Sequence, residues 1–507
     1  MQYLIGVDIG TSGSKAVMTD ETGHIYSSGY QQYNYLTRPG NRVEQDPAVW
    51  VKGFIGAVRE CVESAGKDQK EIKALAVSGL YGGSGVPVDT GYTPLGNCLI
   101  WMDRRARDET EWIKERIDGK TLLSITGNYV DSYFGITKIL WLKNNRPDIW
   151  KKTHRLMTPK DYLIYLMTGE DLTDYSSAGN IGGVFDLKKM TWSDQLLREL
   201  RIEPSKFPEK IVESTAVAGY LNETFAGKTG LQKGLPVIAG GIDAPVAQLS
   251  GGTVREREHV AMVGTSMCWG FLHDGSSVSK GLVSFPYVLN GEKLVYSFGG
   301  GATSGAIVEW FANQLGGVEM NAAEEAGLSV YELLELKARR SPPGANGLIV
   351  LPYFMGERSP IWDQDARGML FGLNLSHTRA DIYRAFLEGV AYSLRHNMEA
   401  AQTMAIDLEE TCSIVGGAAK SPLWLRIFAD ITGYKVKRTI QNVEAPLGDA
   451  FLAGRGIGLI EKVEKIKEWV QYEEPIPPDP QNRTLYKKQF DIYKALYERN
   501  ADLMKKI

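Results

Sequence analysis

Two aspartates of this 507-residue chain stand where a carboxylate could serve phosphate chemistry. Asp243 follows the apolar run GLPVIAGG and precedes a helix-like stretch. A carboxylate at the end of a strand can accept the proton of a substrate hydroxyl in phosphoryl transfer, and a helix N-terminus helps to keep it ionised. Asp8 lies just before a turn of small residues, where it could hold Mg²⁺ through water. The alternative interpretations are capping of a turn by Asp8 and capping of a helix by Asp243.

Three turns of small residues could bind phosphate. They are GTSGSK at 10–15, GTSM at 264–267 and GGAAKS at 416–421. Backbone N–H groups in tight turns bind phosphate oxygens, and Ser and Thr hydroxyls add donors. Each turn taken alone is better explained as an ordinary hairpin turn, but their joint occurrence favours phosphate binding.

Several other kinds of site are not expected. The sequence has no GxxxxGK[ST] motif, and no GxGxxG motif follows a predicted strand, which disfavours the P-loop and dinucleotide-binding classes. The four cysteines stand singly and the six histidines form no close pair. We therefore expect neither a disulfide framework nor a zinc site.

The composition is that of a folded globular protein, with 43% hydrophobic and 23% charged residues. Lys and Arg number 57 against 61 Asp and Glu, for a net charge of −4, so we expect no nucleic-acid partner. The chain contains no apolar run of the ~18 residues that a membrane span needs, and its start lacks the basic region of a signal peptide. We expect a cytoplasmic protein with no membrane partner.

A β-hairpin is predicted to position Asp8 and the first turn. YLIGVDI (3–9) and KAVMT (15–19) would be its strands, and HIYSSGY (24–30) would add a third strand to make a meander. The same pattern returns at 258–272, where VGTS at 263–266 repeats IGTS at 9–12. Because Gly10 and Gly264 lie half a chain apart, we predict a duplicated domain.

Helices are predicted between apolar strands, which indicates an α/β architecture. Asp46 reads as the N-cap of a helix with Pro47 in its first turn. Buried strands are expected within 71–79, 234–241, 346–354 and 412–417. The composition changes from glycine to dense charge at 251–259, so we predict one domain at 1–253 and a second at 254–507. A final amphipathic helix is expected over 485–507, after PIPPDP.

Four segments resemble the FGGY carbohydrate kinases, the relatives of xylulokinase, gluconokinase and glycerol kinase. They are VDIGTSGSKAV, YFGITKILWLKNN, LPYFMGERSPIWDQDARGMLFGL and GGAAKSPLWLRIFADITG, in the order and spacing of that family. The resemblance implies two duplicated actin-like ATPase (ribonuclease H-like) domains with an interdomain catalytic cleft. It also implies ATP and Mg²⁺ as cofactors, a sugar or polyol substrate, and a homodimer.

The resemblance assigns roles residue by residue. Asp243 matches the catalytic base, and Asp8 looks like the aspartate that holds Mg²⁺ through water, with Asp243 beside the same metal. The nucleotide phosphates would be bound by two hairpins, and the rest of the nucleotide by later loops. The residues matched are Gly10, Thr11, Ser12 and Lys15 in the first hairpin, Gly264, Thr265 and Ser266 in the second, and Gly305, Gly416, Gly417, Ala418 and Lys420 in the later loops.

The segments SGLYGGSG (78–85) and IWMDRRA (100–106) resemble the sugar-contacting loops of the family. The candidates for sugar contact are Tyr81, Trp101, Asp103, Arg104 and Tyr133. A carboxylate accepts hydrogen bonds from neighbouring hydroxyls, and an aromatic face covers the C–H side of a polyol. Arg104 could instead be a surface charge or part of an ion pair. The sequence departs from xylulokinases at Tyr81-Gly82, where Met-His is usual, and at Ala244, where many relatives carry an amide.

These features predict a kinase that transfers the γ-phosphate of ATP to a hydroxyl of a ketopentose such as xylulose. The alternatives within the class are another ketose, a polyol or gluconate. An actin-like ATPase or a sugar-sensing binding protein without phosphate transfer would be an alternative of another class. Asp243 and the segment GERSPIWDQDARG favour the sugar kinase over both.

Overall fold

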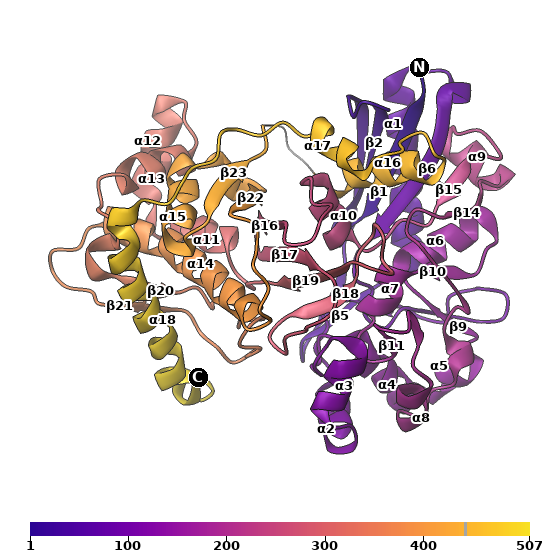
Figure 1. Ribbon diagram of the computed structural model, residues 1–507, viewed down its shortest axis with the longest axis horizontal. Coiled ribbons are helices and arrows are strands. Elements are labelled where there is room, and N and C mark those ends of the chain that lie inside the picture. Colours follow the sequence, from indigo (N-terminus) through magenta and orange to yellow (C-terminus); the bar gives the residue numbers. More distant parts are fainter. Residues whose placement is uncertain (441–443) are drawn as a thin grey trace. The chain divides into compact units, whose positions relative to one another are not determined.

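The structure is a computed structural model that describes residues 1–440 and 444–507. The chain forms two compact units, whose elements are labelled in Figure 1. The first unit comprises Met1–Glu256, Leu272–Ser297 and Val443–Val470, and the second comprises Arg257–Phe271, Phe298–Asn442 and Gln471–Ile507. Each unit therefore consists of three separate stretches of the sequence.

Six strands form the central sheet of the first unit, in the order β14-β15-β6-β1-β2-β3. They are β1 (Tyr3–Ile9), β2 (Gly13–Asp20), β3 (Ile25–Gln32), β6 (Ile72–Gly79), β14 (Val217–Tyr220) and β15 (Pro236–Ile238). β1, β2 and β3 form the predicted antiparallel meander. β6 runs parallel to both β1 and β15, so the carboxyl ends of these three strands meet at one edge of the sheet.

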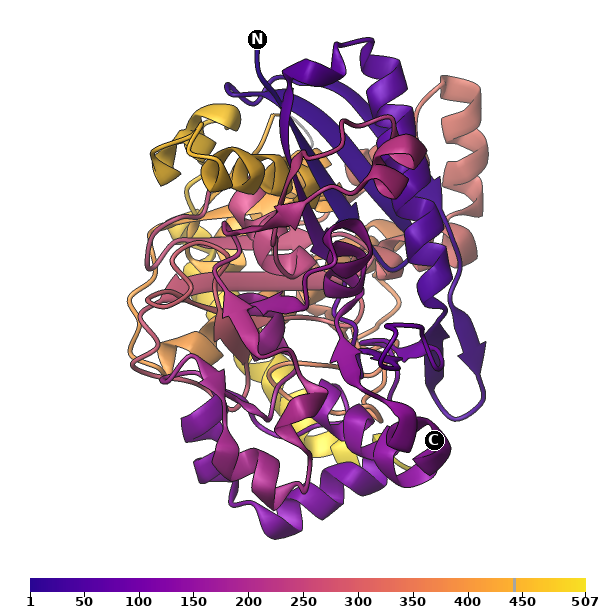
Figure 2. The same ribbon diagram turned by 90° about the vertical axis from the view of Figure 1, so that its right-hand side faces the viewer.

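The two faces of β1 meet different helices. Because side chains alternate along a strand, Ile5 and Val7 lie on one face, where they share a core with Trp50 and Phe54 of α1 (Pro47–Ala65). Asp8 has the opposite parity, as does Gly6, over which α16 (Ala445–Gly456) packs. Figure 2 shows the strands between the violet α1 and the golden α16.

The predicted start of α1 is confirmed. The Asp46 carboxylate accepts a hydrogen bond from the backbone N–H of Ala48 at 2.9 Å, and Pro47 is the first helical residue. The other helices of the first unit are α2 (Arg107–Arg116), α3 (Gly119–Thr126), α4 (Gly135–Asn145), α5 (Pro147–Lys152), α6 (Pro159–Thr168), α7 (Tyr175–Asn180), α8 (Asp194–Glu199), α9 (Glu223–Thr229), α10 (Asp243–Ser250) and α17 (Ile466–Trp469).

Short strands brace the long connections of the first unit. β4, β5 and β8 form a three-stranded sheet, β7 pairs with β9, β10 pairs with β13, and β11 pairs with β12. Their bounds are β4 (Leu36–Arg38), β5 (Arg42–Gln45), β7 (Val86–Val88), β8 (Cys98–Leu99), β9 (Arg155–Met157), β10 (Leu172–Asp174), β11 (Phe185–Asp186), β12 (Thr191–Trp192) and β13 (Lys210–Val212). β18 (Val283–Pro286) lies beside α7.

The second unit repeats the strand pairing of the first. β16 (His259–Val263) is antiparallel to β17 (Met267–His273) and parallel to β22 (Thr411–Val415), which is followed by the parallel β23 (Lys435–Arg438). This matches the order β2-β1-β6, and the predicted duplication is confirmed at the level of topology. β19 (Val295–Gly299) crosses the sequence border between the units, and β20 (Ile349–Leu351) pairs with β21 (Met369–Phe371).

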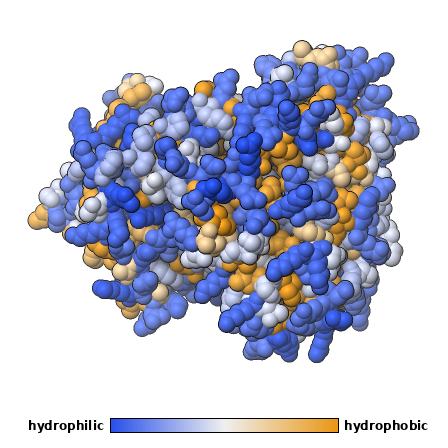
Figure 3. Space-filling model, viewed as in Figure 1, coloured by the Kyte–Doolittle hydropathy of each residue, from blue (hydrophilic) through white to orange (hydrophobic). Residues whose placement is uncertain are grey.

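Helices make up most of the remaining second unit. They are α11 (Gly305–Leu315), α12 (Gly317–Ala326), α13 (Val330–Ala338), α14 (Arg379–Gln402), α15 (Pro422–Thr432) and α18 (Arg483–Met504). α18 is the predicted closing helix, and it packs on α15 and β20. Hydrophilic residues cover most of the face in Figure 3. Within residues 1–440 and 444–507, none of the helices has the length and hydrophobicity that a membrane span requires.

The close approach of α16 to β1 depends on Gly6. A Cβ atom at Gly6 would lie 1.9 Å from the carbonyl oxygen of Pro446 and 2.4 Å from the nitrogen of Ala450. We expect Gly6→Ala to destabilise the protein by about 2 kcal/mol, because backbone atoms must move apart to admit the methyl group. A lowered melting temperature in circular dichroism would show this effect.

Gly227→Ala is the matched control, since a Cβ at Gly227 in α9 would meet nothing within 4 Å. We expect it to leave the melting temperature unchanged or raise it, because Ala is the better helix former. Equal melting temperatures for the Gly6→Ala variant and the wild type would contradict the packing argument.

Candidate active site

The edge of the first sheet brings Asp8 and Ser78 together. The parallel register pairs Asp8 near the end of β1 with Ser78 near the end of β6, and the Ser78 Oγ lies 3.3 Å from Asp8 Oδ1. Lys15 is opposite Asp8 on β2, and its ammonium group forms an ion pair with Glu444 at 2.6 Å. Burial raises the pKa of Asp8 to about 7, although Lys15 and the Ser78 hydroxyl act to lower it.

Asp243 lies at the same edge as the first residue of α10. The neighbouring Ile242 forms a parallel bridge with Gly79, and the Gly79 N–H donates to the carbonyl of Gly241 at 3.1 Å. The alternative of Asp243 as a helix N-cap is wrong, because Ile242 occupies that position and no side chain caps the helix. The Asp243 carboxylate instead accepts the N–H of Ala244 at 2.7 Å.

The two aspartates influence each other electrostatically. Burial and, to a lesser degree, the negative charge of Asp8 raise the pKa of Asp243 to about 8, although the hydrogen bond from Ala244 acts to lower it. Two poorly solvated carboxylates fit a divalent cation, since Mg²⁺ is usually bound by one or two protein carboxylates, water and substrate phosphates. Asp8 and Asp243 are thus the residues of this edge that could hold Mg²⁺.

Asp449 is a third carboxylate that the sequence analysis missed. It lies in α16, fully buried, and its Oδ2 accepts a hydrogen bond from Ser78 Oγ at 2.6 Å. Burial raises the pKa of Asp449 well above its usual range. An acidic residue within the otherwise small and apolar run APLGDAFLAG was the signal that could have found it.

The first hairpin turn is tied to the loops around it. The Gly10 N–H donates to the carbonyl of Gly13 at 3.0 Å, and the carbonyl of Gly10 accepts the Tyr33 hydroxyl at 2.8 Å. The next two carbonyls, of Thr11 and Ser12, also accept hydrogen bonds, from Gln45 Nε2 at 2.9 Å and from the N–H of Tyr33 at 3.0 Å. These hydrogen bonds to three successive carbonyls fix the backbone of the turn that carries the hydroxyls of Thr11 and Ser12.

Four predicted sugar residues lie close to the first hairpin or to one another. The Trp101 indole donates to Thr11 Oγ1 at 3.0 Å. The rings of Tyr81 and Tyr133 have centroids 5.2 Å apart, and the Arg104 guanidinium lies 5.9 Å from the Tyr133 ring. Arg104 also forms an ion pair with Asp131 at 2.6 Å, so the predicted alternative of an ion pair is confirmed for this residue.

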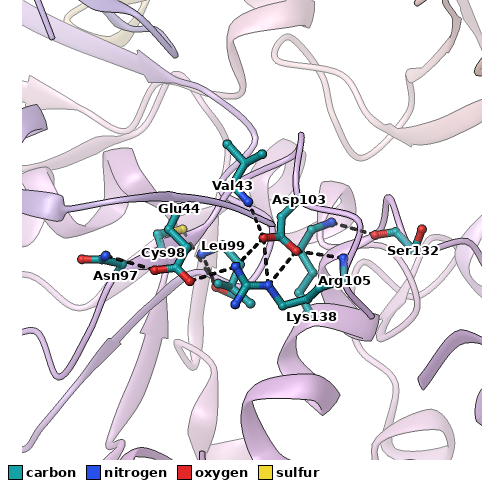
Figure 4. A network of polar contacts seen from close by, with 10 residues as sticks. Val43, Glu44, Asn97, Cys98, Leu99, Asp103, Arg105, Ser132 and Lys138 are labelled. Atoms are coloured by element: carbon teal, nitrogen blue, oxygen red, sulfur yellow. Dashed lines mark hydrogen bonds and ion pairs between the residues drawn. The ribbon is translucent and has the colours of Figure 1, made fainter. Parts of the chain in front are cut away.

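Asp103, the fifth predicted sugar residue, has its oxygens engaged by the protein. It is fully buried and accepts hydrogen bonds from the N–H of Val43 at 2.7 Å and from Arg105 Nη2 at 2.7 Å (Figure 4). Arg105 also binds Glu44 at 2.8 Å. A sugar hydroxyl would have to compete with these donors, so sugar contact by Asp103 stays a prediction.

Lys138 is a buried cation beside these residues that the sequence analysis also missed. Its ammonium group donates to the carbonyl of Ser132 at 2.9 Å (Figure 4) and to that of Tyr133. Burial and, to a lesser degree, the positive charge of Arg104 lower the pKa of Lys138 to about 7. The lysine thereby fixes the backbone that carries Tyr133.

In the second unit, three of the predicted nucleotide loops lie side by side. The Gly264 carbonyl accepts the Gly305 N–H at 2.7 Å, and the Thr265 carbonyl accepts the Ser304 N–H at 3.0 Å. A Cβ at Gly416 would lie 2.8 Å from the carbonyl of Val263, directly before the hairpin turn. The turn at 264–266, the start of α11 and the loop after β22 therefore converge.

The other predicted nucleotide residues of the second unit lie in the same turn and loop. Ser266 closes the hairpin, because its carbonyl accepts the Gly264 N–H at 3.0 Å. Gly417, Ala418 and Lys420 form a single 3-10 turn in which Ala418 is buried and Gly417 and Lys420 are exposed. Contact of these residues with a nucleotide stays a prediction.

Comparison with known proteins adds a further observation. Residues 3–250 match the N-terminal domain of the FGGY family of carbohydrate kinases, and residues 259–457 match its C-terminal domain. The chain belongs to this family. The predicted resemblance, the two-domain actin-like fold and the classification as an ATP:sugar phosphotransferase are thereby confirmed.

The relatives of this chain include enzymes whose names refer to different sugar substrates. It is 32% identical to a xylulose kinase of Bacillus subtilis (strain 168), over 99% of this chain and 98% of that one. It is 28% identical to a gluconokinase of the same strain, over 92% of this chain and 90% of that one. The crystal structure of ligand-bound xylulose kinase from Lactobacillus acidophilus matches its fold with a TM-score of 0.90 at 24% identity, over 99% of each chain.

The electrostatic coupling of the two aspartates can be measured in the metal-free kinase. With ¹³C-labelled aspartate, the NMR signal that disappears in Asp243→Asn should titrate with a pKa of about 8. Because the raised pKa means that a proton is bound below that pH, Asp243 should be protonated at pH 6. Replacing Asp8 with Asn should lower this pKa, since a like charge is removed. A pKa unmoved by Asp8→Asn would contradict the coupling.

Proposed function

We propose that this kinase transfers the γ-phosphate of ATP to a hydroxyl of a ketopentose such as xylulose, with Asp243 as the general base. The observation that carries the proposal is the placement of Asp243, whose carboxylate meets one backbone N–H and the charge of Asp8. A carboxylate whose pKa is raised is a stronger proton acceptor once it is ionised. The names of the xylulose kinase relatives support the choice of sugar.

In the proposed reaction, the acceptor hydroxyl attacks the γ-phosphorus while its proton passes to Asp243. A P–O bond forms to the sugar, and the bond between the γ-phosphorus and the oxygen retained by ADP breaks. Asp8, through water, and Asp243 would hold Mg²⁺, which neutralises phosphate charge when bound. Lys15 would add a cation at the first hairpin once it parts from Glu444.

The aromatic side chains Tyr81, Trp101 and Tyr133 would cover the carbon chain of the sugar. On the nucleotide side, the turn 264–266 would bind phosphate. Gly305, whose N–H donates to the Gly264 carbonyl, would lie along the nucleotide, and 416–420 would contact the adenosine. Gluconate is less favoured, because its carboxylate needs a cation. Arg104 is already paired with Asp131, and Arg105 with Asp103 and Glu44. Lys138, beside the same residues, binds the carbonyls of Ser132 and Tyr133.

Replacing Asp243 with Asn tests the base. We expect kcat to fall by about 10³-fold, the upper part of the range for general-base catalysis. ADP affinity in calorimetry without Mg²⁺ should stay within a factor of about two, because Asn keeps the shape of the side chain and no metal bridges it to the nucleotide under these conditions. Asp148→Asn, on the exposed surface of α5, is the control and should retain wild-type turnover. Undiminished turnover in Asp243→Asn would remove this residue from the base role.

A panel of ketopentoses, other ketoses, polyols and gluconate in a coupled ADP-release assay tests the substrate. We expect xylulose to give the highest kcat/KM, and gluconate to give a value lower by at least about tenfold, the effect of one unmet charged hydrogen bond. A higher kcat/KM for gluconate would overturn the choice of sugar without affecting the assignment of the base.

A further inference from the structure

The segment GERSPIWDQDARG (356–368) is one of the sequence features that favour a sugar kinase. None of its residues has a role in the proton transfer proposed above. Its first residues lie in the second unit, beside residues 300–304, which lead into α11. Glu357 is only 3% exposed. Because a buried carboxylate requires compensating hydrogen bonds, the contacts of Glu357 and its neighbours indicate what the segment does.

Glu357 binds backbone donors rather than a single cation. Its Oε1 accepts the N–H of Ala302 at 2.7 Å and the N–H of Arg358 at 2.8 Å. Its Oε2 accepts the Ser393 hydroxyl from α14 at 3.4 Å. The next residue but one, Ser359, accepts the N–H of Gly300 on its hydroxyl. Two backbone donors of residues 300–304 are therefore held by side chains of this one segment.

Arg358 binds the same region through carbonyl groups. Its Nη2 donates to the carbonyl of Met267 at 3.0 Å and to that of Gly301 at 3.1 Å. Met267 directly follows the hairpin turn 264–266, and its own N–H donates to the Gly301 carbonyl at 3.1 Å. The packing is tight, since a Cβ at Gly300 would lie 2.6 Å from the Met267 carbonyl and 2.8 Å from Arg358 Nη2.

We propose that Glu357 and Arg358 are positioning residues for the nucleotide. They fix residues 300–305 against the turn 264–266, so that the shape of this turn is set for phosphate before the nucleotide arrives. Such preorganisation strengthens binding, because less chain entropy is lost in the complex. This inference rests on the nucleotide site proposed above.

Arg358→Met in the full-length chain is the first test. We expect MgADP affinity in calorimetry to fall by at least about tenfold, the effect of losing charged hydrogen bonds to two carbonyls. The KM for the sugar should change by less than about twofold, because a change that weakens only nucleotide binding leaves the affinity for the sugar unchanged. Amide hydrogen exchange should become faster at 264–267 and 300–305.

Arg367→Met is the matched control. Arg367 belongs to the same segment and also binds carbonyls, but those of Gln364 and Ala366 within its own loop. We expect wild-type MgADP affinity and unchanged exchange at 264–267. Equal losses of affinity in Arg358→Met and Arg367→Met, or wild-type affinity in Arg358→Met, would overturn the proposal.

Glu357 offers a second test that survives if Arg358→Met does not fold. The Oε1 of Gln can accept both backbone N–H groups, so Glu357→Gln should keep MgADP affinity within about threefold, whereas Glu357→Ala should lose at least about tenfold. Equal affinities in the two variants would contradict the proposal. The exchange measurement needs neither sugar nor nucleotide, so it separates failure of this inference from failure of the proposed reaction.

Discussion

When both are ionised, Asp8 and Asp243 repel each other at an edge of the first sheet where water screens their charges poorly. Like charges stay together only where the surrounding chain fixes both backbones. The pairing of β1 with β6 fixes Asp8, and the bridge between Gly79 and Ile242 fixes Asp243. The packing of α1 and α16 on opposite faces of the sheet holds these strands in place. A cation at this edge would relieve the repulsion, which is the physical basis for the metal-bound phosphate that we propose there.

The two units share one strand topology, but the strands that lead into their hairpin turns carry different charges. Met262 in β16 and Asp8 in β1 each stand two residues before the glycine that opens the turn, so the two positions correspond. On the neighbouring strand, Met262 is paired with Cys268, whereas Asp8 is paired with Lys15. The second hairpin therefore carries no charged pair behind its turn. A neutral turn backed by the Glu357 and Arg358 contacts suits phosphate, because an acidic residue there would repel it. In the proposed reaction, the carboxylate of Asp8 behind the first turn would serve metal binding.

Local features of the sequence were enough to predict the hairpins, the capped start of α1 and the strand that leads to Asp243. Such features depend on neighbours a few residues apart. The sequence could not reveal that Ser78 contacts Asp449, or that Arg358 binds the carbonyl of Met267, because these pairs are joined only by the folded chain. Asp103 illustrates the same limit, since its type suits a sugar ligand while its oxygens bind Arg105 and the distant backbone of Val43.

The helix that covers one face of the first sheet comes from residues 445–456, close to the end of the chain. During translation, the strands around Gly6 must therefore wait for almost the whole polypeptide to leave the ribosome before that face is covered. At about 5–20 residues per second, this interval lasts tens of seconds. A nascent chain with such a long-exposed apolar face is a natural client for chaperones, and a fragment that stops at the middle of the sequence would keep the face bare.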